Sequence, residues 1–134
     1  MTFLLDTSIL SQPLRKNPSL PALARWNQAG DHTCTTSIVC HAEIEWGLLK
    51  QDDPHRQRRY HELIRPRLTA LPTDSTCWKI FAQLKARQFL IGETVADLDL
   101  LLAATARQHD LILATLNKKD FSRVEGLRWE DWSR

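Results

Sequence analysis

Short apolar runs alternate with stretches of helical periodicity along the whole chain. The spacing of apolar residues predicts helices over residues 20–29, about 38–50, 52–64, about 75–91 and 98–108. Strands are predicted over residues 3–5, 32–36, 68–71, 111–115 and 127–129. Candidate helix caps are Thr7 or Ser8, Thr36 or Ser37, Asp74 or Ser75, and Asp97. The alternation predicts a single α/β domain over residues 1–134, a three-layer α/β/α sandwich around a short central parallel sheet.

The predicted helix over residues 38–50 carries an apolar stripe at Ile38, Ala42, Trp46 and Leu49. A stripe of this kind normally packs against the core of a globular domain, so we predict that this face lies inward. The tryptophans are interpreted mainly as core or interface residues, with stacking on nucleic-acid bases as the less favoured interpretation. They are Trp26, Trp46, Trp78, Trp129 and Trp132.

The composition excludes several classes of protein. With 134 residues, 43% of them hydrophobic, the chain can form one core without disulfides or a structural metal. Cys34, Cys40 and Cys77 form no Cys-x-x-Cys pair, which predicts free thiols in a reducing cytoplasm. No apolar run reaches the roughly 18 residues of a membrane span, and the N-terminus does not resemble a signal peptide. The formal net charge of +2 permits an RNA ligand but does not indicate one.

Acidic residues follow two of the predicted strands. In an open parallel sheet, the ligand site lies beyond the carboxyl ends of the strands. Asp6 follows the strand over residues 3–5, and Asp120 comes shortly after the strand over residues 111–115. Each also has a purely structural interpretation. Asp6 could begin a helix, and Asp120 could cap the turn before Phe121.

Two helices each offer a pair of acids, of which only one can face a shared site. Residues two apart differ by about 200° around a helix. Glu43 lies one turn before Gly47, which has no side chain to obstruct an approach, so Glu43 rather than Glu45 is predicted to face the site. Asp99 is predicted to face it because Asp97 is the more natural cap. Glu43 could equally be a surface acid, and both aspartates suit the positive end of a helix dipole.

Convergence of these acids would have a chemical consequence. Two carboxylates about 4 Å apart repel by about 4 kcal/mol at an effective dielectric of 20, so several together need a cation or must hold protons. Oxygen ligands select a hard ion, which makes Mg²⁺ or Mn²⁺ the expected cofactor. Such an ion can activate a water and neutralise a phosphodiester. The pattern therefore predicts hydrolysis of a nucleic-acid backbone.

Four segments resemble, in order, the motifs of PIN-domain ribonucleases. They are Leu4–Leu10, Thr36–Gly47 with a Glu four residues before a Gly, Asp99–Ala106 with an Asp before an apolar stretch, and Ala114–Phe121. The closing segment Val124–Trp132 is typical of VapC toxins and their FitB-like relatives, which belong to type II toxin–antitoxin systems. The resemblance covers nearly the whole chain at the spacing of the family.

The resemblance implies that Asp6, Glu43 and Asp99 are the catalytic, metal-binding acids. The fourth motif departs from the family, because many relatives have Asp where this chain has Asn117, three residues before Asp120. Either Asn117 contributes an amide oxygen, or Asp120 supplies the charge as a metal ligand, or the last ligand is water. Candidate supporting residues are Thr7, Thr115, Asn117 and Asp97.

The resemblance also implies a PIN fold, endoribonuclease activity on structured RNA, often transfer RNA, and a homodimer. It further implies inhibition by a cognate VapB-like antitoxin whose C-terminal segment covers the site. Basic residues could form a solvated surface, a phosphate-binding rim or an antitoxin-docking surface. These residues are Arg56, Arg58, Arg59, Lys118 and Lys119.

Two rival functions use the same features. One is another Mg²⁺-dependent phosphoesterase, such as a phosphatase or a DNA nuclease. The other is a non-catalytic PIN-like module that binds RNA or a protein, an alternative that Asn117 at the fourth position leaves open. The triplet His41-Ala42-Glu43 begins the signature of zinc deaminases, but no Pro-Cys-x-x-Cys follows it, which argues against that class.

Overall fold

A parallel sheet of five strands forms the centre of the protein. The computed structural model describes all 134 residues, and its strands lie in the order β3-β2-β1-β4-β5. All neighbouring strands are parallel. The strands are β1 (Phe3–Leu5), β2 (Cys34–Ser37), β3 (Ala70–Leu71), β4 (Ile112–Thr115) and β5 (Trp129–Asp131). Each predicted strand is present, although several bounds differ by one or more residues.

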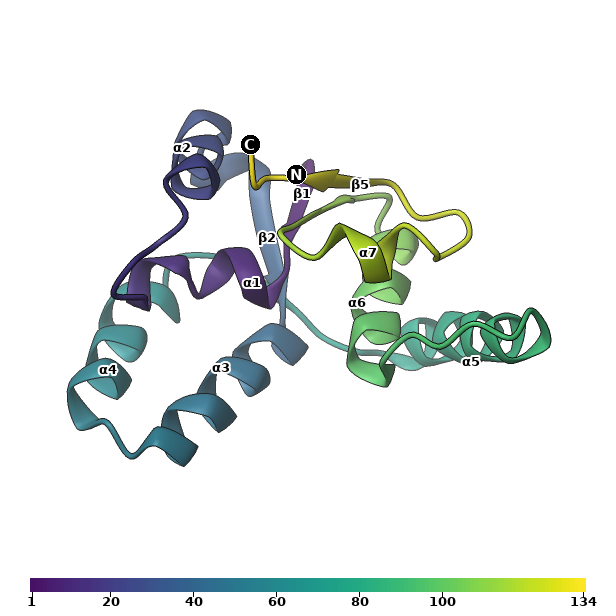
Figure 1. Ribbon diagram of the computed structural model, residues 1–134, viewed down its shortest axis with the longest axis horizontal. Helices are drawn as coiled ribbons and strands as arrows, with labels where there is room; N and C mark the ends of the chain where they lie inside the picture. Colours follow the sequence, from purple (N-terminus) through teal and green to yellow (C-terminus); the bar gives the residue numbers. More distant parts are fainter.

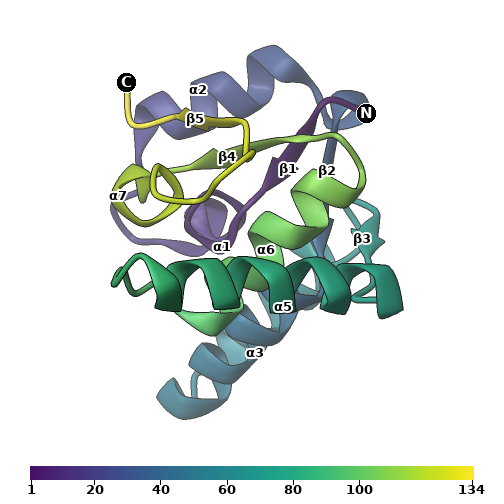
Figure 2. The same ribbon diagram turned by 90° about the vertical axis from the view of Figure 1, so that its right-hand side faces the viewer.

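Helices cover both faces of this sheet. They are α1 (Thr7–Leu10), α2 (Leu20–Ala29), α3 (Ile38–Gln51), α4 (Pro54–Arg59), α5 (Ser75–Leu90), α6 (Asp97–Gln108) and α7 (Lys118–Phe121). Short helical turns add η1 (Gln12–Leu14), η2 (Asp31–Thr33) and η3 (Tyr60–Ile64). In Figure 1, α1, α2 and α4 lie to the left of the central strands, and α5 and α6 lie to the right. Figure 2 shows α5 and α6 in front of the sheet. The predicted α/β/α sandwich is confirmed.

Polar side chains at strand ends fix where the next helices begin. Asp6 caps α1, because its backbone is extended and its carboxylate accepts a hydrogen bond from a backbone N–H of the first turn. The interpretation of Asp6 as the start of a helix is therefore confirmed, and that of Thr7 or Ser8 as the cap is wrong, because Asp6 is the last residue before the helical backbone. Ser37 and Asp74 cap α3 and α5, as predicted.

The second strand is polar in sequence but wholly buried. Thr35 Oγ1 donates a hydrogen bond to the carbonyl of Thr69 at 2.6 Å, and Thr36 Oγ1 donates to the carbonyl of Leu5 at 2.9 Å. Because each hydroxyl has a partner, its burial costs little free energy. β2 can therefore lie between β1 and β3, and α3 begins at the carboxyl edge of the sheet.

The predicted inner face of α3 is wrong. Trp46 is 67% exposed and Leu49 is 70% exposed, whereas Cys40, Ile44 and Leu48 are buried on the other side of the helix. The helix is apolar nearly all round, so its apolar residues form two sets with helical spacing. Packing of α3 against α1 and α4 selects the second set for the core. The first set remains on the surface.

The hydrophobic core holds all three cysteines, Cys34, Cys40 and Cys77, as free thiols, as predicted. Among the remaining tryptophans, Trp26 and Trp132 are buried, Trp129 is half-buried, and Trp78 is 48% exposed. No helix is long and apolar enough to span a bilayer.

Candidate active site

A polar pocket lies at the carboxyl edge of the sheet, where β1 and β4 end side by side. The Asp6 N–H donates a hydrogen bond to the carbonyl of Ala114 at 3.1 Å, so the residues that follow the two strands are neighbours. The pocket has a volume of about 250 Å³ and brings together side chains that are far apart in sequence. Its lining residues are Asp6, Thr7, Ser8, Arg15, Glu43, Asp99, Leu102 and Asn117.

Asp6 is buried and held by hydrogen bonds on both carboxylate oxygens. Oδ1 accepts hydrogen bonds from Ser8 Oγ at 2.6 Å and from the Ile9 N–H at 3.1 Å. Oδ2 accepts a hydrogen bond from Thr115 Oγ1 at 2.5 Å. Burial raises the pKa of Asp6 above its usual value, and the hydrogen bonds from Ser8 and Thr115 oppose this rise. The orientation of the carboxylate is therefore fixed by the protein alone.

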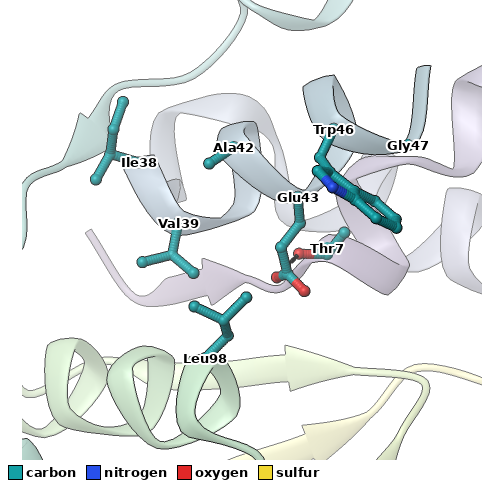
Figure 3. Close-up of a pocket in the computed structure, with 8 residues that line it drawn as sticks. All are labelled: Thr7, Ile38, Val39, Ala42, Glu43, Trp46, Gly47 and Leu98. Atoms are coloured by element: carbon teal, nitrogen blue, oxygen red, sulfur yellow. Dashed lines mark hydrogen bonds between the residues drawn. The ribbon is translucent and has the colours of Figure 1, made fainter. Parts of the chain in front are cut away.

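Glu43 reaches the same pocket from α3. Its Oε1 accepts a hydrogen bond from Thr7 Oγ1 at 2.6 Å, which ties α3 to the start of α1 (Figure 3). Glu45, two residues later, accepts a hydrogen bond from Tyr60 Oη at 3.3 Å and does not line the pocket. The helical separation of the two glutamates therefore leaves Glu43 as the acid that faces the pocket.

Asp99 is the least constrained acid of the pocket. No hydrogen bond from the protein reaches its carboxylate, which lies in the first turn of α6. Burial, together with the negative charges of Asp120, Glu43 and Asp6, raises the pKa of Asp99 to about 6. This effect on Asp99 shows that the four acids share one negative field.

Asp97 lies outside the pocket. Its carboxylate is 2.9 Å from Lys85 Nζ on α5, and both side chains are more than half exposed. Asp97 is not the cap of α6 either, because Ala96 occupies the cap position and no side chain caps the helix. The lysine on the neighbouring helix competes for this carboxylate, which corrects the prediction of Asp97 as a cap and sets it apart from the pocket.

Asn117 and Asp120 interact with each other at the turn after β4. The Asn117 side-chain amide donates a hydrogen bond to Asp120 Oδ2 at 2.8 Å, and the Asn117 backbone N–H donates to Thr115 Oγ1 at 2.8 Å. Asn117 lines the pocket, whereas Asp120 affects it through its charge on Asp99. Thr115 thus links this turn to Asp6.

The donor set of the pocket suits a hydrated, hard divalent cation. All of its candidate ligands are oxygens, and burial together with the neighbouring negative charges raises the pKa of Asp99. No three Asp, Glu, His or Cys side chains are gathered tightly enough to enclose a metal ion together. Mg²⁺ commonly binds to one or two carboxylates and keeps several waters, so the arrangement fits that ion.

Two residues of the pocket were missed at the level of sequence. Ser8 Oγ donates to Asp6 and accepts a hydrogen bond from the Leu116 N–H at 3.0 Å, so it joins β1 to the turn after β4. Arg15 lines the pocket but forms no ion pair within the protein. The Asp-x-Ser spacing hints at the role of Ser8, because a hydroxyl two residues after an Asp can reach its carboxylate, but nothing local signals Arg15.

The predicted basic rim is only partly beside the pocket. Arg56 lines a neighbouring depression together with Thr7, Arg15 and Glu43. The guanidinium of Arg59 instead donates a hydrogen bond to the carbonyl of Pro13 at 2.9 Å, which is an internal structural contact. The remaining members are exposed, and they are Arg58, Lys118 and Lys119.

Comparisons with known proteins identify the family of the chain. The family model "PIN domain" matches residues 3–127. The chain is 33% identical to Ribonuclease VapC2 from Haemophilus influenzae over 98% of both chains, and 31% identical to the tRNA(fMet)-specific endonuclease VapC from Shigella flexneri over 99% of both. It superposes with a TM-score of 0.88 on a crystal structure of DNA-bound VapBC from Salmonella typhimurium, with 26% identity and 98% of both chains covered. Since motif order, fold and these matches agree over nearly the full length, the chain belongs to the PIN-domain family.

Proposed function

We propose that this chain is the toxin of a type II toxin–antitoxin pair and a Mg²⁺-dependent endoribonuclease that hydrolyses RNA phosphodiester bonds. The observation that carries this proposal is the pocket lined by Asp6, Glu43 and Asp99 in a chain of the PIN-domain family. The raised pKa of Asp99 supports it, because an excess of negative charge in a polar pocket creates affinity for a cation.

The acids have different proposed tasks. Asp6 and Asp99 are the main ligands of the ion, and Glu43 completes the negative site. Asp120, or the amide oxygen of Asn117, supplies the remaining polar contact. A divalent ion held by these residues would supply an activated water as nucleophile and would neutralise negative charge on the phosphate.

Side chains around the acids position them for this chemistry. The hydroxyls of Ser8 and Thr115 hold both oxygens of Asp6, and the hydroxyl of Thr7 holds Glu43. Each hydroxyl restricts rotation of its carboxylate, which keeps the ligands preorganised. Arg15 offers an unpaired positive charge to a phosphate at the edge of the pocket.

The partners follow from the family. We expect a VapB-like antitoxin to inhibit the enzyme, since the similar structure is a VapBC complex. The substrate is RNA, and the transfer-RNA specificity named for the Shigella relative makes transfer RNA the first candidate. Arg56, Arg58, Lys118 and Lys119 form a basic border for either partner. We expect a homodimer that acts in the cytoplasm, where its substrate lies.

Cleavage assays test the activity directly. The purified protein is incubated with total RNA, with single- and double-stranded DNA and with a small phosphoester, each with Mg²⁺ and with EDTA. Cleavage of RNA alone, abolished by EDTA and by Asp99→Asn, is the expected result. Cleavage of DNA or of the small ester would indicate another phosphoesterase. Binding of RNA without any cleavage would indicate a non-catalytic module.

A further inference from the structure

Gly47 has no structural reason to be a glycine. It lies inside α3, where glycine is among the least favourable residues for helix stability. Its backbone is helical, and a Cβ built on it would meet no atom within 4 Å. An alanine would therefore fit without a clash and would stabilise the helix. The open space above Gly47 points instead to something outside the chain that approaches the helix backbone closely.

A large apolar groove lies beside Gly47, between α3 and the start of α6 (Figure 3). Its volume is about 770 Å³, and it is lined mainly by Ile38, Val39, Ala42, Trp46 and Leu98. We call it the α3 groove. These residues include the exposed set of the helix, so the apolar stripe that does not face the core forms this surface instead.

The α3 groove is continuous with the acidic pocket. Thr7 and Glu43 line both cavities, and Figure 3 shows the Trp46 ring beside the Glu43 side chain. On the other side of Gly47, a depression of about 210 Å³ reaches Arg15 and Arg56. A single strand bound at the acids can therefore pass over Gly47, with the groove on one side and two arginines on the other.

Trp46 has the chemistry of a stacking platform. Its indole is 67% exposed, although an aromatic ring of this size normally packs inward. Lys50 Nζ lies 5.2 Å from the ring centroid, and Lys50 forms no salt bridge. Proteins that bind single-stranded nucleic acid combine aromatic side chains that stack on bases with cationic groups that follow the phosphates.

We propose that Trp46 stacks on one unpaired nucleobase of the RNA next to the cleaved bond, while the sugar–phosphate backbone crosses α3 over Gly47. This inference rests on the proposed ribonuclease function and names a feature of its substrate: an unstacked base beside the scissile phosphate. RNA rather than a protein is the proposed occupant because the α3 groove opens into the carboxylate pocket. The groove and pocket are bordered by Lys50 and Arg15, which form no salt bridge and whose charges match phosphates.

Removal of the stacking partners, one at a time and together, tests the role of Trp46. An RNA fragment that the wild type cleaves is prepared with an abasic ribose at each position that flanks the cleaved bond. At the stacked position, the abasic ribose should lower kcat/KM of the wild type about tenfold. Trp46→Ala should lower kcat/KM for the intact RNA by a similar factor and should show no further loss with the abasic RNA. Trp46→Phe should retain most of the activity, and Leu49→Ala, an exposed apolar control on the same helix, should match the wild type.

Substitution of Gly47 tests the path of the backbone. Gly47→Ala should raise Tm by about 3 °C because it favours the helix, and yet lower kcat/KM for RNA several-fold. Gly47→Gln should nearly abolish cleavage while the fold remains intact. A residue with a merely structural role could not gain stability and lose activity together.

The outcomes separate this inference from the function on which it rests. Equal abasic penalties in the wild type and Trp46→Ala would overturn the stacking role, as would full activity of Gly47→Gln. Unchanged RNA cleavage by Trp46→Ala together with weaker binding of the cognate antitoxin would assign the groove to that protein and also overturn the inference. A wild type that cleaves no RNA with Mg²⁺ would instead overturn the proposed function itself.

Discussion

Asp6 and Asp99 line the same pocket but are held in opposite ways. Asp6 is buried, caps α1 and accepts hydrogen bonds on both carboxylate oxygens. Asp99 accepts none and lies among three other negative charges. One acid is thus part of the framework that joins β1 to β4, and the other is a free charge on α6. The difference shows that the pocket combines a rigidly held acid with one that the fold itself does not need.

The largest expected effect is one that the two acids share. Asp6→Asn and Asp99→Asn should each lower RNA cleavage roughly a thousandfold, because each removes a charge that holds the cation. Steady-state cleavage of a fluorescent RNA at fixed Mg²⁺ measures this loss. Asp97→Asn is the matched control on α6 and should stay within about twofold of the wild type, since Asp97 is paired with Lys85 outside the pocket. Substantial activity in Asp99→Asn would remove this acid from the proposed site.

Substitutions of Asp6 and Asp99 should change the stability of the protein in opposite directions, although both should lower activity. Asp6→Ala removes a helix cap and leaves the Ser8 and Thr115 hydroxyls without their acceptor, so it should lower the free energy of unfolding by about 2 kcal/mol. Asp99→Asn removes a charge from a repulsive field and should raise it by about 1 kcal/mol at pH 7, after allowance for partial exposure. Urea unfolding in EDTA measures both. Changes of the same sign would contradict the comparison.

The same contrast explains how far the sequence could predict the site. Asp6, Glu43 and Asp99 are predictable because the carboxyl ends of parallel strands meet at one edge and helical geometry separates Glu43 from Glu45. The pairing of Asp97 with Lys85 depends on how α5 packs against α6, which no local pattern encodes. The position of Asp97 outside the pocket therefore depends on tertiary contacts.

The fold shows the same division. The strands are predictable from short apolar runs, and even polar β2 was found, although its burial depends on carbonyls of neighbouring segments that accept its hydroxyl protons. The inner face of α3 was not predictable, because the helix is apolar nearly all round and two stripes satisfy the same period. The helix predicted over residues 52–64 is present from Pro54 to Ile64, and its hydrogen bonding changes from α-helical in α4 to π-helical in η3.

A substitution of Thr115 should have a smaller effect and tests how Asp6 is held in place. Thr115→Val keeps the shape of the side chain but removes the hydrogen bond to Asp6 Oδ2 and the acceptor of the Asn117 N–H. We expect about a tenfold loss of cleavage, because the Asp6 carboxylate is no longer fixed. The pKa of Asp6 should rise further, which moves the acid limb of the pH–rate profile to higher pH. Thr115→Ser should restore most of both. An unchanged profile in Thr115→Val would show that Asp6 does not depend on this hydroxyl.

The smallest expected effect is the contribution of Asp99 to the pH dependence of stability. In the metal-free protein, the pKa of Asp99 is raised from 3.8 to about 6, so the folded state holds its proton more tightly than the unfolded state does. The resulting stability is full below about pH 4 and is lost as the pH rises through 6. Between pH 7 and pH 5, the wild type should therefore gain about 1 kcal/mol more free energy of unfolding than Asp99→Asn gains.

Urea titrations at both pH values in EDTA measure this difference in slope, and Mg²⁺ provides the control. A cation beside Asp99 favours its ionised form, so saturating Mg²⁺ should lower the pKa and remove the excess slope of the wild type. Asp99→Asn, which has no proton to lose at this position, should respond little to the ion at either pH. If the free energy of unfolding of the two proteins changes equally between pH 7 and pH 5 in EDTA, the pKa of Asp99 is not raised in the folded state. The contrast drawn between Asp99 and Asp6 would then be wrong.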